Sequence, residues 1–189
     1  MEESKIKNEL MEWLKACVFA FAVVWIVNAF LFSPVKVKGA SMMPTVEEGE
    51  RVIVNKIGKS FSDFERSDII VFEESPGTYF IKRVIGIPGD TIEYKNDVLY
   101  VNGEKVEEPY LDTNKEGLVD TGTLTEDFTL YDYTGEQKVP EGQLFVLGDN
   151  RRKSSDSRDS RVGFIEIESV LGTTNIVSWP VQKIRIINN

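Results

Sequence analysis

Residues 16–32 read ACVFAFAVVWIVNAFLF and divide the chain into two parts of different character. The run holds seventeen residues without a charge, and its one polar side chain is Asn28. A run of this length is at the short end of what crosses a bilayer as a helix, and Pro34 disfavours helical backbone at the residue before it. We therefore expect a transmembrane signal-anchor helix over residues 16–33, after a short cytoplasmic head of residues 1–15.

Two other interpretations of this apolar run are open. A cleaved secretory signal peptide has an apolar core of about 7 to 15 residues that ends in small residues of the A-x-A type, and the sequence around Phe32 has no such site. A buried core helix would show one apolar stripe, whereas this run is apolar all round. Lysines and glutamates are mixed in the head, so the positive-inside rule favours an orientation only weakly.

Composition limits the chemistry of the whole chain. Its 189 residues carry 22 Lys+Arg against 31 Asp+Glu, which gives a net charge of -9 and fits one domain with an appendage. Histidine is absent, which excludes Ser-His-Asp and Cys-His nucleophiles, and the single Cys17 excludes a disulfide framework and a thiolate zinc site. The acidic balance argues against binding a phosphate backbone, so we expect no nucleic acid partner.

Residues 34–189 predict a mainly β domain, an antiparallel sheet or a partly open barrel. Short apolar or alternating runs are separated there by Gly, Pro, Asp and Asn. Asn96-Asp97 and Asn102-Gly103 are expected hairpin turns, and the acidic, weakly periodic residues 111–139 read as an excursion inserted between strands. The expected strands are residues 35–38, 50–56, 68–72, 79–86, 91–95, 98–101, 143–147, 169–178 and 183–187.

A serine and a lysine stand out in this domain. GASMMPT at residues 39–45 is by itself an ordinary strand-to-turn junction, and its two methionines equally suit membrane contact. In YFIKRVIGIPGD at residues 79–90, a strand would place Phe80, Lys82 and Val84 on one face. Such a lysine either snorkels to an edge and pairs with a carboxylate, or is desolvated. Desolvation would lower its pKa, and the neutral amine could then take a proton from a serine hydroxyl.

The third unusual segment is LGDNRRKSSDSRDSR at residues 147–161. Its composition could suit a disordered RNA-binding segment or an aspartate-lined calcium loop. Apolar strands are expected directly before and after this segment and the chain is acidic, which argues against a disordered RNA-binding segment. The glycine and terminal glutamate of an EF-hand are missing, which argues against a calcium loop. An ordered loop held by Asp-Arg pairs and serine hydroxyls fits better, and such a loop could orient an amine beside it.

Together and in this order, SMMPT, KRVIGIPGD and GDNRRKSSDSR resemble the motifs of type I signal peptidases. These are membrane-bound serine proteases that remove signal peptides from exported proteins. The resemblance covers nearly the whole chain, and one anchor helix with a short insertion resembles the compact Gram-positive-type members. Each motif alone is weak, but three motifs that agree in order and spacing are highly specific.

The resemblance implies roles for individual residues. Ser41 would be the nucleophile, Lys82 the general base, and Ser154 would hydrogen-bond the amine. The backbone N–H of Ser41 would hold the oxyanion, and Gly39 stands where some members carry a second hydroxyl donor, which leaves that donor open. Substrates would carry small residues at positions -1 and -3. Implied ion pairs that hold the loop involve Asp149, Asp156, Arg158 and Arg83, and the implied pocket walls are Val35, Val37, Met42, Phe80 and Ile81.

A Ser-Lys dyad is also the variant of nucleophilic catalysis that is open to a chain without histidine, and it needs neither a metal nor an organic cofactor. The expected partners are preprotein signal peptides and membrane lipid, with the N-terminus cytoplasmic, the β domain extracytoplasmic and the protein monomeric. Two other classes of protein fit the sequence less well. A self-cleaving repressor-type protease needs a DNA-binding domain where this chain has its apolar run, and a non-catalytic β module would not need both Ser41 and Lys82.

Overall fold

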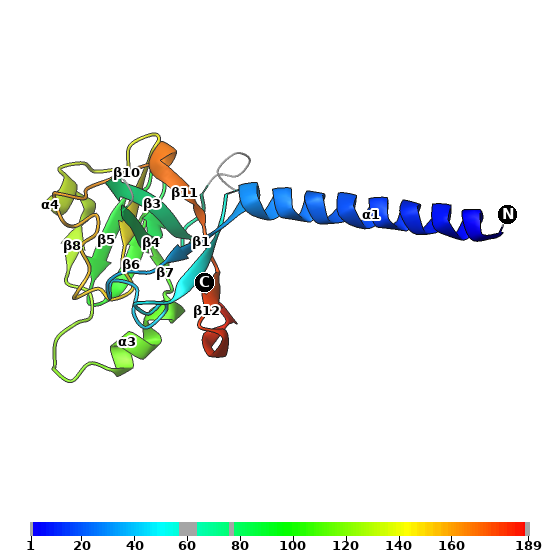
Figure 1. Ribbon diagram of the computed structural model, residues 1–189. Helices are drawn as coiled ribbons and strands as arrows, with labels where there is room; N and C mark the ends of the chain where they lie inside the picture. The colour runs from blue at the N-terminus through cyan, green and yellow to red at the C-terminus, as the bar shows by residue number, and fades with distance from the viewer. Residues whose placement is uncertain (1, 57–63, 76–77, 188–189) are drawn as a thin grey trace.

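The computed structural model describes residues 2–56, 64–75 and 78–187, and of residues 2–8 and 26–32 it describes the backbone alone. A long helix, α1 (Glu2–Leu31), extends from a β-rich body (Figure 1). β1 (Phe32–Lys36) follows at once and pairs antiparallel with β2 (Arg51–Asn55), so the chain enters the body directly from the helix.

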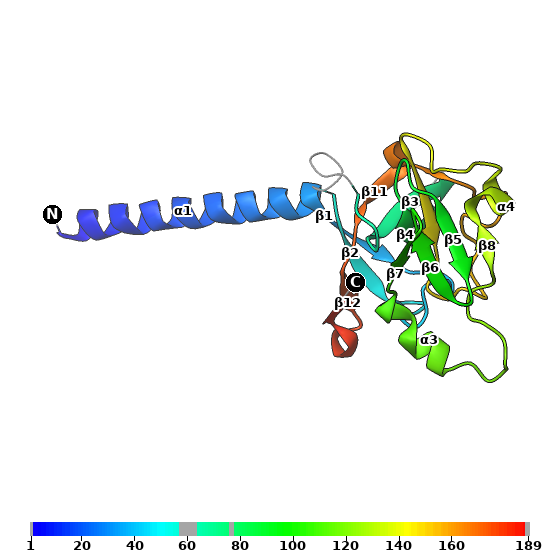
Figure 2. The same cartoon turned by 180° about the vertical axis from the view of Figure 1, so that it is seen from behind.

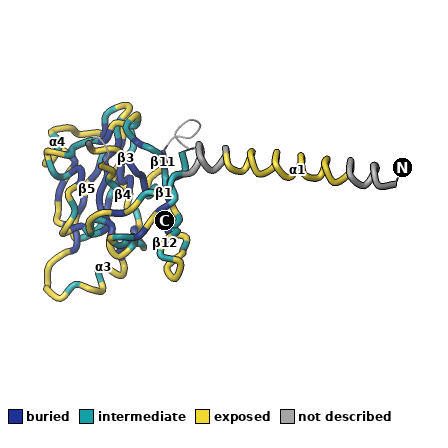
Figure 3. The backbone as a smooth tube through the Cα atoms, viewed as in Figure 1, coloured by how far each residue is buried: buried dark blue, intermediate teal, exposed yellow. Residues whose placement is uncertain are grey.

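Within the part of the chain that the structure describes, no helix combines the length and the apolar character that a membrane crossing requires. The apolar run of residues 16–32 extends over residues 26–32, whose side chains lie outside the described part. The described side chains of α1, residues 9–25, are all exposed (Figure 3).

The body is built from two antiparallel sheets, which confirms the mainly β expectation. In the larger sheet the strand order is β10-β9-β4-β3-β11-β2-β12-β13, and β1 pairs with β2 beside this path. Neither sheet closes into a barrel among the described residues, so the expected β domain has open sheets. The further strands of this sheet are β3 (Ile69–Ser75), β4 (Thr78–Gly86), β9 (Gln143–Leu147), β10 (Ile165–Glu166), β11 (Val170–Thr173), β12 (Ile176–Trp179) and β13 (Arg185–Ile186).

The smaller sheet has the order β7-β6-β5-β8, formed by β5 (Ile92–Lys95), β6 (Val98–Val101), β7 (Glu104–Val106) and β8 (Phe128–Thr129). Both expected hairpin turns are confirmed, because Asn96, Asp97, Asn102 and Gly103 all have positive φ angles, as tight reversals between strands require. Short helices complete the body: η1 (Pro109–Leu111), α3 (Asp112–Glu116), α4 (Leu130–Thr134), η2 (Ile167–Ser169) and η3 (Val181–Lys183).

One expectation about strands was wrong. The single strand expected over residues 169–178 is two strands, β11 and β12, which both pair with β2; β11 also pairs with β3, and β12 with β13. The excursion of residues 111–139 is also more ordered than its sequence indicates, because its β8 pairs with β5 and completes the smaller sheet.

The strand β4 contributes to all three hydrophobic clusters of the core. Ile81 packs in one cluster with Val37 and Met42, Val84 in a second and Ile85 in a third. All residues from Ile81 to the end of β4 are buried. This packing holds β4 in place and takes its two cationic residues away from water.

Candidate active site

A serine and a lysine meet beside strand β4 of the larger sheet. Lys82 lies on β4, and Ser41 lies in the loop between β1 and β2. The Nζ atom of Lys82 donates a hydrogen bond of 2.8 Å to the Oγ atom of Ser41. Only 3% of the Lys82 surface is exposed, so the lysine is shielded from bulk water, whereas Ser41 is half-buried.

Burial lowers the pKa of Lys82 from its ordinary value of 10.5 to about 8, although the charges of Asp156 and Asp149 act in the opposite direction. Lys82 forms no ion pair with a described carboxylate, and its Nζ atom lies 5.0 Å from the centre of the Phe80 ring. The structure thus favours the desolvated lysine over the snorkelling one. A substantial share of the Lys82 amines is neutral near pH 8 and able to accept a proton from Ser41.

The loop that carries Ser41 is tied to the loop after β9. The backbone carbonyl of Ser41 accepts a hydrogen bond from the Asn150 backbone N–H at 2.9 Å, and the Asn150 Nδ2 atom donates to the Ala40 carbonyl at 3.0 Å. Thr45 donates its hydroxyl to the Asp149 carboxylate at 2.6 Å. These bonds leave the Ser41 side chain little freedom to move away from Lys82.

Residues 111–139 also contribute hydrogen bonds to the site, although no sequence motif connects these residues with Ser41 or Lys82. The Asn114 amide on α3 donates to the backbone carbonyl of Asp149 at 2.6 Å and to that of Met43 at 3.2 Å. Asn114 therefore bridges the two loops. Thr45 and Asn150 lie inside the recognisable motifs and could have been found there, whereas no local pattern marks Asn114.

The ion pairs expected around the loop are present. Arg83 donates from Nε and Nη2 to the two carboxylate oxygens of Asp149, at 2.9 and 2.8 Å, and neither side chain is exposed. Arg158 binds Asp156 in the same two-pronged way at 2.9 and 2.8 Å, and Asp156 also accepts the backbone N–H of Gly148 at 3.0 Å. Both carboxylates thus lie at the turn that follows β9.

Ser154 is placed beside the pair but does not make the expected bond to Lys82. Its Oγ atom is buried and has no hydrogen-bond partner among the described residues. A methyl group on Gly148 would lie 2.3 Å from this Oγ atom and 2.4 Å from the Ser41 carbonyl oxygen. The Ser154 hydroxyl therefore lies next to the Ser41 loop, in a space that only a glycine at position 148 leaves open.

A pocket of about 200 Å³ opens over Ser41 and Lys82. Four of the five expected substrate-binding residues, Val37, Met42, Phe80 and Ile81, line this pocket, which we call the dyad pocket. Val35 does not line it and instead packs against the hydrophobic cluster behind it. The other lining residues are Lys38, Gly39, Ala40, Lys153 and Ser155.

A second buried arginine, which no motif predicts as part of the site, connects the loop to the smaller sheet. Arg151 pairs with Glu108 at 2.6 Å, donates to the Tyr94 hydroxyl at 2.6 Å and to the Gly148 carbonyl at 3.1 Å. Tyr110 donates to the same Glu108, and its ring lies 3.7 Å from the Arg83 guanidinium. This network links the two sheets behind the dyad pocket.

Among the residues that the structure describes, no cluster of three or more His, Cys, Asp and Glu side chains is arranged to hold a metal ion. The chemistry that the described site offers is that of a hydroxyl beside a buried amine. Such a pair can carry out acyl transfer, because the amine activates the hydroxyl as a nucleophile.

Comparisons with known proteins agree with this chemistry. The family model of signal peptidase, peptidase S26, matches residues 10–179. The chain belongs to this signal peptidase family. This member is 44% identical over 181 residues to signal peptidase I of Bacillus licheniformis, which covers 95% of this chain and 94% of the relative. It is 49% identical over 164 residues to signal peptidase I of Bacillus caldolyticus, covering 87% and 88%.

The fold agrees with a solved structure of the same family. A crystal structure of a signal peptidase I from Enterococcus faecalis is 44% identical and matches with a TM-score of 0.54, over 59% of this chain and 97% of that chain. The resemblance carried by the three motifs is thereby confirmed, and this signal peptidase family member is a serine peptidase.

Proposed function

We propose that this protein removes N-terminal signal peptides from exported preproteins, with Ser41 as nucleophile and Lys82 as general base. The observation that carries the assignment is the 2.8 Å hydrogen bond between a buried lysine and a serine, in a chain that belongs to the signal peptidase family. Signal peptidase I is the name of the relatives that match nearly the whole chain.

The reaction proceeds in two halves. Neutral Lys82 takes the proton of the Ser41 hydroxyl while Oγ attacks the carbonyl carbon of the scissile bond, and the backbone N–H of Ser41 stabilises the oxyanion. Lys82 then gives the proton to the leaving amine, and the mature protein departs. Lys82 then takes a proton from water, which attacks the acyl carbon; the bond to Ser41 Oγ breaks, Lys82 returns the proton to Oγ, and the signal peptide leaves.

The dyad pocket accounts for a preference for small side chains at positions -1 and -3. Its volume is about 200 Å³, and its walls include the apolar side chains of Val37, Met42 and Ile81. A pocket of this kind rejects a larger side chain by steric overlap. Gly39 offers no side-chain donor, so the backbone N–H of Ser41 is the oxyanion donor that we assign.

The buried groups around the dyad act on its geometry. The pairs Arg83–Asp149 and Arg158–Asp156 hold the loop that faces Ser41, and this loop carries Ser154. The unpartnered Ser154 hydroxyl is a hydrogen-bond acceptor beside the dyad, and we assign it to the Lys82 ammonium that forms after proton transfer. None of these side chains takes part in bond making.

The apolar run supplies the anchor in this proposal. Residues 16–33 would span the membrane, residues 1–15 would lie in the cytoplasm, and residues 34–189 would form the extracytoplasmic catalytic domain. Exposed apolar side chains along the described part of α1 support contact with lipid. Tethering to the bilayer raises the effective concentration of enzyme and signal peptide, which is in the same membrane.

The test is cleavage of a precursor with an A-x-A site by the detergent-solubilised full chain. Ser41→Ala and Lys82→Ala should each lower kcat by about a thousandfold or more, because each removes one half of the nucleophilic pair. Ser160→Ala and Lys95→Ala change exposed residues of the same types and should cleave as the wild type does. Mass spectrometry should place the new N-terminus directly after the -1 alanine. Continued cleavage without Ser41 would overturn the proposal.

A further inference from the structure

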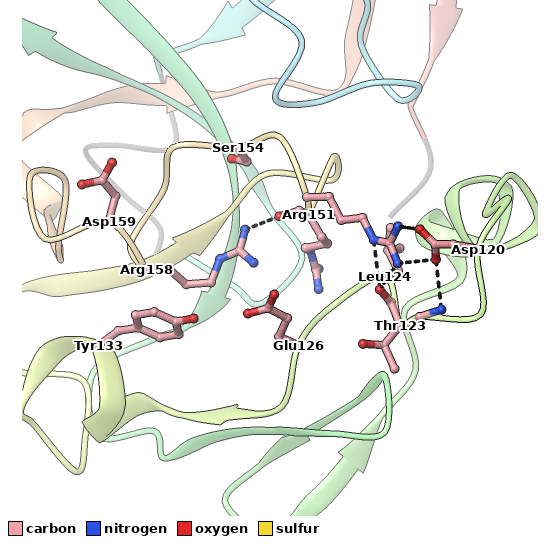
Figure 4. Close-up of a pocket in the computed structure, with 11 residues that line it drawn as sticks. Asp120, Thr123, Leu124, Glu126, Tyr133, Arg151, Ser154, Arg158 and Asp159 are labelled. Atoms are coloured by element: carbon pink, nitrogen blue, oxygen red, sulfur yellow. Dashed lines mark hydrogen bonds and ion pairs between the residues drawn. The ribbon is translucent and has the colours of Figure 1, made fainter.

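A second and larger pocket, of about 610 Å³, lies between the excursion and the loop after β9 (Figure 4). We call it the polar pocket, because charged and hydroxyl side chains dominate its wall. The residues that line it are Asp120, Gly122, Thr123, Leu124, Glu126, Tyr133, Arg151, Arg152, Ser154, Arg158 and Asp159.

The polar pocket and the dyad pocket are separated by one short segment. Lys153 and Ser155 line the dyad pocket, whereas Arg152 and Ser154 line the polar pocket. A peptide bound at Ser41 that continues past this segment therefore arrives at the polar pocket.

The polar pocket lies on the side of the molecule away from the helix. Tyr133, in its wall, belongs to α4, and α4 is at the end of the body farthest from α1 in both views (Figures 1 and 2). In contrast, Val37 in the dyad pocket directly follows β1, the strand that continues α1. A substrate whose signal part comes from the side of α1 would therefore direct its other part toward the polar pocket.

Most charges of the polar pocket are already paired. Arg152 binds Asp120, Asp159 binds Arg161, and the remaining two arginines bind carboxylates beneath the wall. Glu126 is exposed and has no ion-pair or hydrogen-bond partner among the described residues. The pocket thus offers one uncompensated negative charge.

The unused polar groups suit a polypeptide. The Nη1 group of Arg158 and the Tyr133 hydroxyl make no hydrogen bond to described residues, and in Figure 4 both point into the same space as the Glu126 carboxylate. The pocket therefore presents donors and acceptors together, as a strand with alternating N–H and C=O groups requires. A simple anion or cation would leave one of these two sets unused.

We propose that the polar pocket binds the early mature segment of the preprotein, on the leaving side of the scissile bond, and favours a basic side chain there through Glu126. The inference rests on the proposed function, because it needs an intact preprotein bound with its scissile bond at Ser41. It also gives the excursion a role in recognition, since Asp120, Glu126 and Tyr133 all belong to residues 111–139.

The test uses synthetic precursors that are identical up to the -1 alanine and carry Lys, Gln or Glu singly at positions +2 to +6. For the wild type, kcat/KM should be about twofold to fivefold higher with Lys than with Glu at one or two of these positions, which is the size of an exposed ion pair. The preference should fall with rising salt, because exposed charges are screened.

Two variants identify the carboxylate responsible. Glu126→Gln should reduce the ratio of kcat/KM between the Lys-containing and the Glu-containing precursors to near unity, through KM. Glu116→Gln makes the same charge change on α3, outside the pocket, and should keep the preference. The inference is wrong if both variants lose the Lys preference equally. It is also wrong if the wild type shows no Lys preference at any of the positions +2 to +6.

The outcomes separate this inference from the proposed function. Absence of cleavage of every precursor by folded wild type would contradict the proposed function itself. Equal cleavage of all precursors, directly after the -1 alanine, would uphold the proposed function and overturn the role of the polar pocket.

Discussion

The dyad pocket and the polar pocket share a wall, yet an ion pair behind the first and an ion pair in the wall of the second differ in their exposure to water. Behind the dyad pocket, the side chains of Arg83 and Asp149 are both 0% exposed. In the polar pocket, the side chains of Arg152 and Asp120 are 37% and 55% exposed. The same chemical pair is thus inaccessible to water at one site and in contact with it at the other.

The difference in exposure between the two ion pairs matches the proposed function of each pocket. A lysine acts as a base near neutral pH when burial lowers its pKa, and buried partners must then hold the nearby loops without solvent. Recognition of varied chains needs accessible groups whose pairs are individually weak. The comparison predicts that deleting a charge of the buried Arg83–Asp149 pair is costly, whereas deleting one of the exposed Arg152–Asp120 pair hardly changes the free energy of unfolding.

The largest effect on stability is expected for Asp149→Ala. The change leaves the buried Arg83 guanidinium without its carboxylate and also removes the acceptor of the Thr45 hydroxyl. The free energy of unfolding should fall by about 3 to 5 kcal/mol, the usual cost of an uncompensated buried charge. Urea unfolding of the detergent-solubilised chain, followed by tryptophan fluorescence, measures it.

A matched double variant shows whether the unpaired charge is the cause. Arg83→Met with Asp149→Leu removes both charges and should recover much of the loss, because an apolar pair of similar size has no desolvation penalty. If Asp149→Ala alone lowers the free energy of unfolding by less than about 1 kcal/mol, the buried pair contributes no more than an exposed one. The proposed difference between the two pockets would then be wrong.

A smaller effect with the opposite sign is expected for Lys82→Met. The pKa of Lys82 is lowered to about 8 in the folded chain, from 10.5. Below pH 8 the lysine is charged in both the folded and the unfolded chain, and folding bears the full cost of burying the ammonium. Between pH 8 and 10.5 the folded chain loses the proton first, so stability of the wild type rises with pH in this window.

At pH 7, Lys82→Met should therefore raise the free energy of unfolding by about 1 to 3 kcal/mol, and this gain should shrink toward pH 10. Lys95→Met, at an exposed position, should show no such pH dependence. In the wild type, kcat/KM should rise with pH around an apparent pKa of about 8, because the neutral amine is the active form. If the free energies of unfolding of Lys82→Met and of the wild type differ by the same amount at every pH, Lys82 is not desolvated.

The sequence predicts those parts of the molecule that local chemistry determines. Long strands such as β4 and the paired turn residues Asn96 and Asp97 follow from alternation and turn preference. Strands of two or three residues, such as β8 and β10, are too short to show a period and form because longer strands offer them an edge.

The same limit applies to the active site. Ser41 and Lys82 lie in motifs that are readable along the chain, whereas Asn114 and Glu108 reach the site through tertiary packing. Nothing near them in the sequence distinguishes them from other polar residues of a loop. The expected hydrogen bond from Ser154 to Lys82 also depended on side-chain geometry, which a motif does not contain.

The smallest effect on stability is expected for Asp120→Ala, which removes the exposed partner of Arg152. Hydrogen bonds from the Arg152 side chain and from the Gly122 backbone lower the pKa of Asp120 to about 2, but solvent screens this pair. The urea midpoint should match that of Glu141→Ala, an exposed acid outside the pocket. Recognition should nevertheless change, because the Nη1 group of Arg152 loses its carboxylate and becomes available to Glu126, whose charge already acts on Arg152, while Nε and Nη2 keep their bonds to the Thr123 carbonyl.

The Lys preference on the leaving side of the scissile bond should then fall in Asp120→Ala while the unfolding midpoint stays, and cleavage of the Gln-containing precursors should be unaffected. In Glu141→Ala, the Lys preference, the unfolding midpoint and the cleavage of the Gln-containing precursors should all be as in the wild type. A large loss of stability in Asp120→Ala would mean that the pair supports the fold as Arg83 and Asp149 do. In that case the exposure of a charged side chain would not tell whether that side chain binds substrate or stabilises the active site.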